Sequence, residues 1–164
     1  METPEMILIT ILIILFLIWG KGSAAAAKYL EVYPELKKVR GSVSKWAARY
    51  SVPPDVVAAV IMQESGGQIP TPPGDDGELG PMQVKQIAYQ ETIDRGLTPK
   101  GLNRSNIDNN IRIGTAYLSL MIDEAGNLED GLRYYNAGPT GAANGGGRIY
   151  AQQVLEKLKR IEDE

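Results

Sequence analysis

The apolar residues of this chain recur at helical spacing over most of its length, and this pattern restricts the fold more than any other feature. One stripe runs through residues 55–65 and a longer one follows Ile107. Sustained two-residue alternation and internal repeats are both missing from the sequence, which disfavours sheet and solenoid folds. We expect a mainly α domain. The predicted helices cover residues 42–50, 55–65, 107–122, 128–135 and 149–161.

The first 27 residues form a separate, hydrophobic segment. Residues 6–19 are uncharged and rich in Ile and Leu, and residues 20–27 can extend this run toward the length of a membrane span. Small residues at 22–27 also suit a signal-peptide cleavage site. However, Glu2 and Glu5 precede the run without any Lys or Arg, whereas a secretory signal has positive charge there. We therefore predict a single N-terminal transmembrane helix, retained as an anchor at 1–27, rather than a cleaved signal.

The rest of the chain divides in two. Residues 28–40 are polar, of mixed charge, and contain Pro34, so they are interpreted as a tether or as a short helix that leads into the domain. Residues 41–164 have the size of one ordinary domain, for which we expect one compact core and one active site.

Composition excludes several kinds of chemistry. The chain has no Cys and no His, which rules out disulfides, thiolate nucleophiles and Ser-His-Asp relays and disfavours a zinc site. Acid-base catalysis near neutral pH is then left to a carboxyl group with a raised pKa, a lysine with a lowered one, or a tyrosine in support. A net charge of -3 without a visible basic stripe argues against nucleic acid as a partner.

Glu64 is the strongest candidate for such a carboxyl group. It follows Val57 and Val60 at helical spacing, and Gly66 comes directly after its helix. Apolar surroundings and the negative end of a helix dipole both raise the pKa of a carboxyl group. The alternative is that Glu64 simply ends the helix and points into water, and its position alone does not decide between the two.

Two other segments invite a functional interpretation. Asp75, Asp76 and Glu78 lie in a loop rich in Pro and Gly, where turn chemistry explains the acids and no calcium-binding spacing is present. We expect a solvated loop. The glycines at 141–147 lack the Lys-Ser/Thr ending of a phosphate loop. The sequence thus predicts neither a metal nor a cofactor.

Four short motifs, in order and in register, resemble the soluble-lytic-transglycosylase family of the lysozyme-like superfamily. They are Gln63-Glu64-Ser65, Gly80-Pro81-Met82-Gln83, Asn110-Ile111 with Gly114 and Tyr117-Leu118, and Tyr135-Asn136-Ala137-Gly138-Pro139. Each alone is weak, but the resemblance extends over residues 41–158.

The resemblance implies a lysozyme-like helical domain with a long cleft for the glycan strands of peptidoglycan. Glu64 aligns with the catalytic glutamate of the family. Lytic transglycosylases cut between N-acetylmuramic acid and N-acetylglucosamine with one carboxyl group and leave a 1,6-anhydro end. The residues that align with supporting or substrate-binding positions are Ser65, Gly80, Met82, Gln83, Asn110, Tyr117, Tyr135, Asn136 and Tyr150.

Two residues depart from the family pattern. Pro81 replaces the usual Leu and is acceptable as the first residue of a helix, where its missing N–H costs nothing. Lys85 stands where a second Met is common, and it can change contacts with the glycan. Two alternatives to the transglycosylase remain. One is a muramidase of the same fold that adds water with help from the acidic loop, and the other is an inactive glycan-binding or structural module.

The anchor and the resemblance together predict a single-pass membrane protein whose domain faces the cell wall and opens it locally. Lys21, Lys28, Lys37 and Lys38 follow the apolar run, however, and would tend to keep the domain in the cytoplasm. Carriage in a phage particle would resolve this conflict. The expected partners are peptidoglycan strands, the lipid membrane at residues 6–27, and proteins of a virion or of a secretion or pilus assembly.

Overall fold

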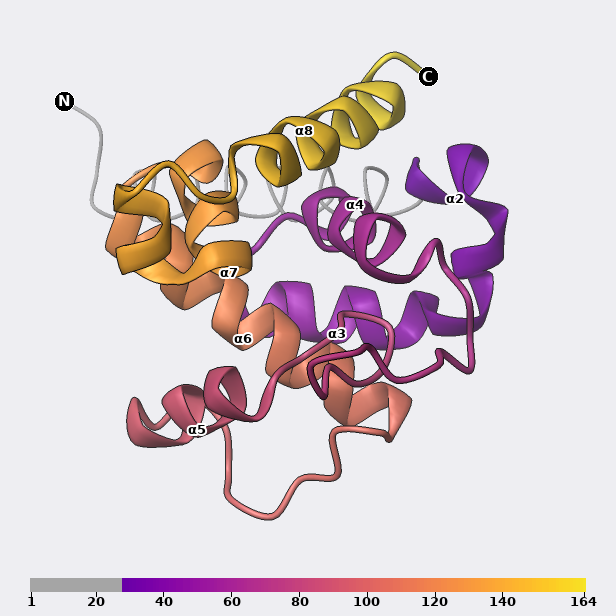
Figure 1. Ribbon diagram of the computed structural model, residues 1–164. Helices are drawn as coiled ribbons and strands as arrows, with labels where there is room; N and C mark the ends of the chain where they lie inside the picture. Colours follow the sequence, from indigo (N-terminus) through magenta and orange to yellow (C-terminus); the bar gives the residue numbers. More distant parts are fainter. Residues whose placement is uncertain (1–27) are drawn as a thin grey trace, which may run out of the picture.

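The computed structural model describes residues 28–164, and these form a helical domain (Figure 1). In this part of the chain the only β pairing is an isolated bridge between Leu79 and Val84. The predicted mainly α fold is therefore confirmed. The elements are α2 (Tyr29–Val32), η1 (Pro34–Val39), α3 (Arg40–Tyr50), α4 (Pro54–Ser65), α5 (Gln86–Asp94), α6 (Ile107–Ala125), α7 (Leu128–Ala143) and α8 (Arg148–Glu162).

Helix α4 lies at the centre of the domain. Six consecutive residues, Val56 to Ile61, are buried, so this helix has no solvent-facing side over its middle turns. It packs against α3 and α8. Pro54 occupies the first turn, where the lack of an N–H costs nothing, and Gly66 ends the helix with a φ of 60°. The central position fixes the direction of the last turn of α4, which carries Glu64.

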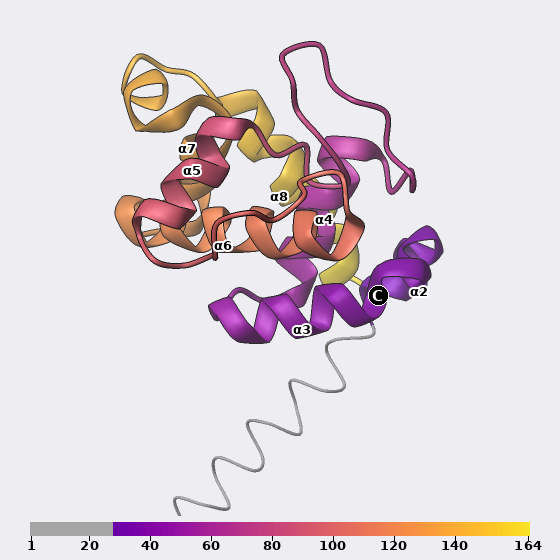
Figure 2. The same ribbon diagram turned by 90° about the horizontal axis from the view of Figure 1, so that it is seen from below.

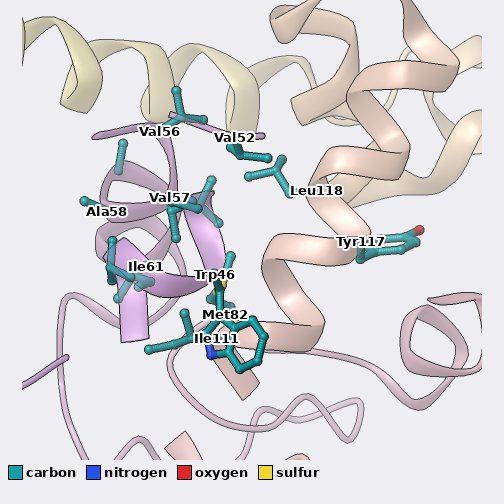
Figure 3. Close-up of a cluster of buried hydrophobic side chains, with 14 of the residues drawn as sticks. Trp46, Val52, Val56, Val57, Ala58, Ile61, Met82, Ile111, Tyr117 and Leu118 are labelled. Carbon is teal, nitrogen blue, oxygen red and sulfur yellow. The ribbon is translucent and has the colours of Figure 1, made fainter. Parts of the chain in front are cut away.

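Helix α6 separates α3 from α5. It contacts both helices, and Figure 2 shows α3 and α5 on opposite sides of it. Asn106 caps α6 through its side chain, which accepts a hydrogen bond from the backbone N–H of Asn109. The buried side chains between α3, α4 and α6 include Val57, Ile61 and Leu118 (Figure 3).

Residues 28–40 are folded onto the domain and do not form the predicted tether. Tyr29 and Leu36 are fully buried, and the hydroxyl of Tyr33 donates a hydrogen bond to the carbonyl of Lys157 in α8 at 3.3 Å. The reason is visible in the sequence: Leu36 and Val39 extend the apolar stripe of α3 backward at helical spacing. Pro34 starts a helix here and does not interrupt one.

This difference gives a direct test of stability. Leu36→Ala should lower the free energy of unfolding by about 2–4 kcal/mol, because it removes a fully buried leucine side chain from the core. Urea denaturation measures the change, with the exposed neighbour Lys37→Ala as the control. Equal stability of the two variants would show that residues 28–40 are a tether after all.

Two helix boundaries also differ from the predicted ones. Pro81 lies in a turn closed by a hydrogen bond from Gln83 N–H to Gly80 C=O at 2.9 Å, and not at the start of a helix. Both Gly80 and Gln83 have positive φ, 69° and 44°, which a helix does not allow. The helix after Leu128 continues slightly past the predicted end at Tyr135 and is broken at Gly138 (φ 69°, ψ 162°), and a second helical stretch within α7 then runs to Ala143.

The predicted anchor at residues 1–27 lies outside the described residues. Within residues 28–164, no helix combines the length and the apolar character needed to cross a membrane.

Candidate active site

A pocket of about 400 Å³ lies at the C-terminal end of α4. Four parts of the chain form its walls: the end of α4, the segment from Glu78 into α5, the middle of α6, and the bend of α7. The lining residues are Glu64, Glu78, Gln83, Val84, Lys85, Ile87, Ala88, Glu91, Tyr117, Tyr135, Asn136, Ala137, Gly138 and Pro139.

Glu64 stands at the wall of this pocket and is tied to α8. The hydroxyl of Tyr150 donates a hydrogen bond of 2.6 Å to Oε1 of Glu64. Tyr150 is 8% exposed and is not part of the pocket lining, so it lies behind the carboxyl group. It is placed to orient Glu64, whereas the sequence predicted it to bind substrate.

The pKa of Glu64 is raised to about 7. Burial is the main cause, because it disfavours the charged form, and the negative charge of Glu78 acts in the same direction. The hydrogen bond from Tyr150 and the positive charge of Lys85 oppose this rise. A substantial fraction of Glu64 is then protonated at neutral pH, and the carboxyl group can give a proton to a bound ligand.

Tyr150→Phe should move the alkaline limb of the pH profile of kcat/KM to higher pH. The hydroxyl of Tyr150 stabilises the carboxylate, so its removal raises the pKa of Glu64 further and keeps the acid protonated over a wider range. The turnover should fall about tenfold as well, because the carboxyl group loses its orienting contact. Initial rates from pH 5 to pH 9 measure both effects. An unchanged alkaline limb would exclude Glu64 as the titrating acid.

Three tyrosine rings, those of Tyr117, Tyr135 and Tyr150, pack in a row beside Glu64. The ring centroids of Tyr117 and Tyr135 are 5.5 Å apart, and those of Tyr135 and Tyr150 are 6.3 Å apart. The Tyr135 hydroxyl donates to the carbonyl of Met82 at 2.9 Å. Tyr117 projects from α6 away from the apolar core around Val57 (Figure 3). These rings keep one side of the pocket apolar, which accounts for part of the desolvation of Glu64.

The turn that carries Met82 and Gln83 is held from below by Asn110. This side chain is fully buried; its Oδ1 accepts from Met82 N–H at 2.9 Å, and its Nδ2 donates to the carbonyls of Leu79 and Arg104 at 2.6 and 2.9 Å. A Cβ atom on Gly80 would meet the Asn110 side chain at 2.5 Å. Gly80 is therefore required for this close approach and for its positive φ.

A second close approach fixes Met82 itself. Met82 is fully buried, and a Cβ atom on Gly114 of α6 would meet its Sδ at 2.6 Å. The Gly114 position in the sequence motif is thus explained by packing of the turn onto α6.

The structure brings together only part of the predicted site. Glu64, Gln83, Tyr117, Tyr135 and Asn136 share the pocket. The other predicted residues do not line it: Ser65 donates back to the carbonyl of Ile61, Tyr150 stands behind Glu64, and Gly80, Met82 and Asn110 build the turn below. These residues support the walls of the pocket, and their predicted contact with substrate stays a prediction.

The sequence did not place the ionic cluster on the other wall of the pocket. Lys85 Nζ lies 3.0 Å from Glu78 Oε1 and 3.5 Å from Asp76 Oδ2. The hydrogen bond from Lys85 lowers the pKa of Glu78 and keeps it a carboxylate. Glu78 was expected in a solvated loop, and its short distance in sequence from Lys85 was the signal that pointed to this pairing.

Glu91 and Ile87 of α5 also line the pocket and were missed. Ile87 is 75% exposed, an unusual state for a large apolar residue on a helix that carries a pocket. Among residues 28–164, no group of three or more acidic side chains is arranged to hold a metal ion.

Comparison with known proteins agrees with this geometry. The sequence model of the transglycosylase SLT domain family matches residues 41–154. Among solved structures, the chain is similar to lytic transglycosylase Slt from Pseudomonas aeruginosa, determined by X-ray crystallography as an inactive mutant, with a TM-score of 0.67 and 20% identity. The match covers 82% of this chain and 25% of that chain, so the likeness concerns the fold of one part of a much longer protein.

Proposed function

The chain belongs to the transglycosylase SLT domain family, and from this premise we propose that it is a peptidoglycan lytic transglycosylase with Glu64 as its catalytic acid and base. One observation supports the proposal most strongly. A single carboxyl group with a pKa of about 7 lies at the wall of a pocket lined by two tyrosines, and a hydrogen bond from Tyr150 holds it in place.

The proposed reaction needs only this one carboxyl group. Protonated Glu64 gives its proton to the oxygen that links N-acetylmuramic acid to N-acetylglucosamine, and the bond from the anomeric carbon to that oxygen breaks. Glu64, now a carboxylate, takes the proton of the muramoyl carbon-6 hydroxyl. That oxygen bonds to the anomeric carbon and closes the 1,6-anhydro ring, which restores protonated Glu64.

A raised pKa suits both halves of this cycle. A carboxyl group with a pKa near 7 is a ready proton donor in the first step and, once ionised, a stronger base than an ordinary glutamate in the second. Tyr150 favours the carboxylate between the two steps by donating to Oε1. Gln83 and Asn136 supply polar groups in the same pocket for the amides and hydroxyls of the sugar.

A muramidase is the second candidate, and Glu78 is the observation that favours it. Its carboxylate lines the same pocket as Glu64 and is kept ionised by Lys85. Hydrolytic glycosidases generally pair one acid with one carboxylate, which either activates water or attacks the sugar. Glu78 would take that second role.

We further propose that residues 6–27 anchor the enzyme in a membrane and that it opens the wall locally, during phage entry or in a secretion or pilus assembly. The apolar run and its acidic start support an anchor. Because the folded part begins at Tyr29, an anchor that ends near residue 27 would hold the pocket within one domain diameter of the membrane.

The full chain, purified in detergent, tests the enzymatic proposal on isolated peptidoglycan sacculi. Mass spectrometry of the released muropeptides should find 1,6-anhydro ends. Reducing muramic ends would support the muramidase, and no release at all would contradict both enzymatic functions and leave a binding module.

A further inference from the structure

From Lys37 in η1 to Arg49 in α3, the charged side chains on the outward side are all basic. Residues 36–50 contain five lysines and arginines and no acidic residue, in a chain whose net charge is -3. The buried positions follow a helical stripe, and the positions between them face solvent. The exposed cations, here called the basic face, are Lys37, Lys38, Arg40, Lys45 and Arg49.

The basic face is not apparent as a continuous run in the sequence, because its cations are distributed over two consecutive elements. The structure joins η1 and α3 end to end at Arg40. Glu35, the nearest acid in sequence, lies against Gly67 near the end of α4, where a Cβ atom on Gly67 would meet its Cγ at 2.6 Å. Asp108 is the one acidic residue of the described part in ion-pair contact with this face, at 3.5 Å from Lys45.

Aromatic rings support the cations at one end of the basic face. Lys45 Nζ lies 4.2 Å from the centre of the Trp46 ring, and Arg112 of α6 lies 4.7 Å from the same ring. Arg49 lies 5.9 Å from the ring of Tyr50. These contacts hold the charges above a packed surface and limit the entropy they lose on binding a partner.

We infer that the basic face rests on the anionic headgroups of a lipid bilayer. Two observations favour this partner over a soluble polyanion. The face begins ten residues after the apolar run 6–27, whose predicted place is the membrane, and clusters of Lys and Arg beside a membrane segment bind anionic lipid. The face is also a helix surface about 15 residues long, which suits a planar partner.

The inference rests on the proposed function, because contact between the basic face and the lipid would direct the pocket away from the membrane. In α6, Asp108, Arg112 and Ser119 contact α3. Tyr117 follows Asp108 by nine residues, about two and a half turns, and so points to the opposite side of α6. Figure 2 shows the resulting order of α3, α6 and α5. With α3 on the lipid, the pocket beside α5 faces the wall.

The absence of cysteine allows a clean test in the full chain. Single cysteines at the exposed positions Ala48 in α3 and Gln90 in α5 are labelled with a fluorophore, and the proteins are reconstituted into vesicles that contain headgroup-spin-labelled lipid. In vesicles of phosphatidylglycerol and phosphatidylcholine, the label at 48 should be quenched strongly and the label at 90 weakly. In phosphatidylcholine alone, or in high salt, the difference should disappear.

Charge variants make the test specific. Lys38→Gln/Arg49→Gln should weaken docking about 25-fold, at about fivefold per cation, while the matched control Lys100→Gln/Arg148→Gln leaves it unchanged. Equal quenching at 48 and 90 in anionic vesicles, or equal effects of the two variants, would overturn the inference. The inference would also fail if docking showed no preference for anionic vesicles and soluble polyphosphate did not change it.

The same variants separate this inference from the proposed function. In detergent, release of muropeptides from sacculi by Lys38→Gln/Arg49→Gln should equal that of the parent chain, because neither residue lines the pocket. An inactive parent that still docks through the basic face would refute the proposed enzyme and leave the membrane contact standing.

Discussion

Glu64→Gln should reduce the rate of glycan cleavage on the order of ten-thousand-fold, the upper end of what one acid-base group contributes. Glutamine keeps the size and the hydrogen bond to Tyr150 but can neither give nor take the proton. The loss should appear in kcat with little change in KM, because binding of the glycan does not require the proton. The release of soluble muropeptides per minute measures it.

The control for this variant is its thermal stability. The pKa of Glu64 determines whether the substitution raises or lowers the melting temperature at a given pH. In the folded chain the pKa of Glu64 is about 7, above its ordinary value of 4.5, so the folded state holds a proton that the unfolded state has lost. The parent chain therefore loses stability as the pH rises from 4.5 to 7, and Glu64→Gln does not. The variant should melt at a higher temperature than the parent at pH 8 and at an equal temperature at pH 4. An inactive variant with a lower Tm at pH 8 would indicate misfolding rather than lost chemistry.

Asn110→Ala should lower the free energy of unfolding by about 3–5 kcal/mol and abolish most of the activity. Its side chain satisfies the N–H of Met82 and the carbonyl of Leu79 in the turn that carries Met82 and Gln83, and the carbonyl of Arg104 before α6. These three backbone groups lose their partners in a buried place. The turn then no longer holds Gln83 in its strained conformation, with φ at 44°. Urea denaturation and muropeptide release measure the two effects.

The neighbouring Asn109→Ala is the matched control. In the described part of the chain, the Asn109 side chain makes no hydrogen bond, and its own N–H bond to the cap residue Asn106 survives the substitution. This variant should be as stable and as active as the parent. If Asn110→Ala were as stable as Asn109→Ala but failed to bind glycan, Asn110 would be a substrate contact, as the sequence alone predicts, and not a support of the turn.

Local sequence predicts the burial and the raised pKa of Glu64 because part of their cause lies within its own helix. The apolar stripe and the glycine that ends the helix lie within ten residues of it, and both are properties of a single helix. The hydrogen bond from Tyr150 depends on how α8 packs on α4, 86 residues away in the chain. Sequence spacing does not report that packing, so the position of Tyr150 behind the acid became visible only in the fold.

Shared motifs identify neighbours of the active site without separating contact from support. Asn110, Gly80 and Gly114 belong to the same motifs as Gln83 and Tyr117, but they hold the turn and α6 together. The opposite error occurred at Glu78. Its charge was typical of a solvated loop, whereas the fold places it beside Lys85 at the pocket wall.

Residues 28–40 show how composition can mislead about a boundary. Their charges and Pro34 are typical of a tether, yet two apolar residues at the correct spacing continue the stripe of α3 and are enough to fold the segment. A helix can bury apolar residues on one side and expose charged residues on the other. In η1 and α3, the exposed charged residues form the basic face.

In the proposed reaction, the carbon-6 hydroxyl of the sugar, and not water, attacks the anomeric carbon. Digestion of sacculi by the full chain in water enriched in the heavy oxygen isotope, followed by mass spectrometry of the muramic ends, distinguishes the two nucleophiles. We expect anhydro ends that contain no heavy oxygen. Reducing ends that carry one heavy oxygen each would contradict this expectation and assign Glu78 the second role in a hydrolytic reaction.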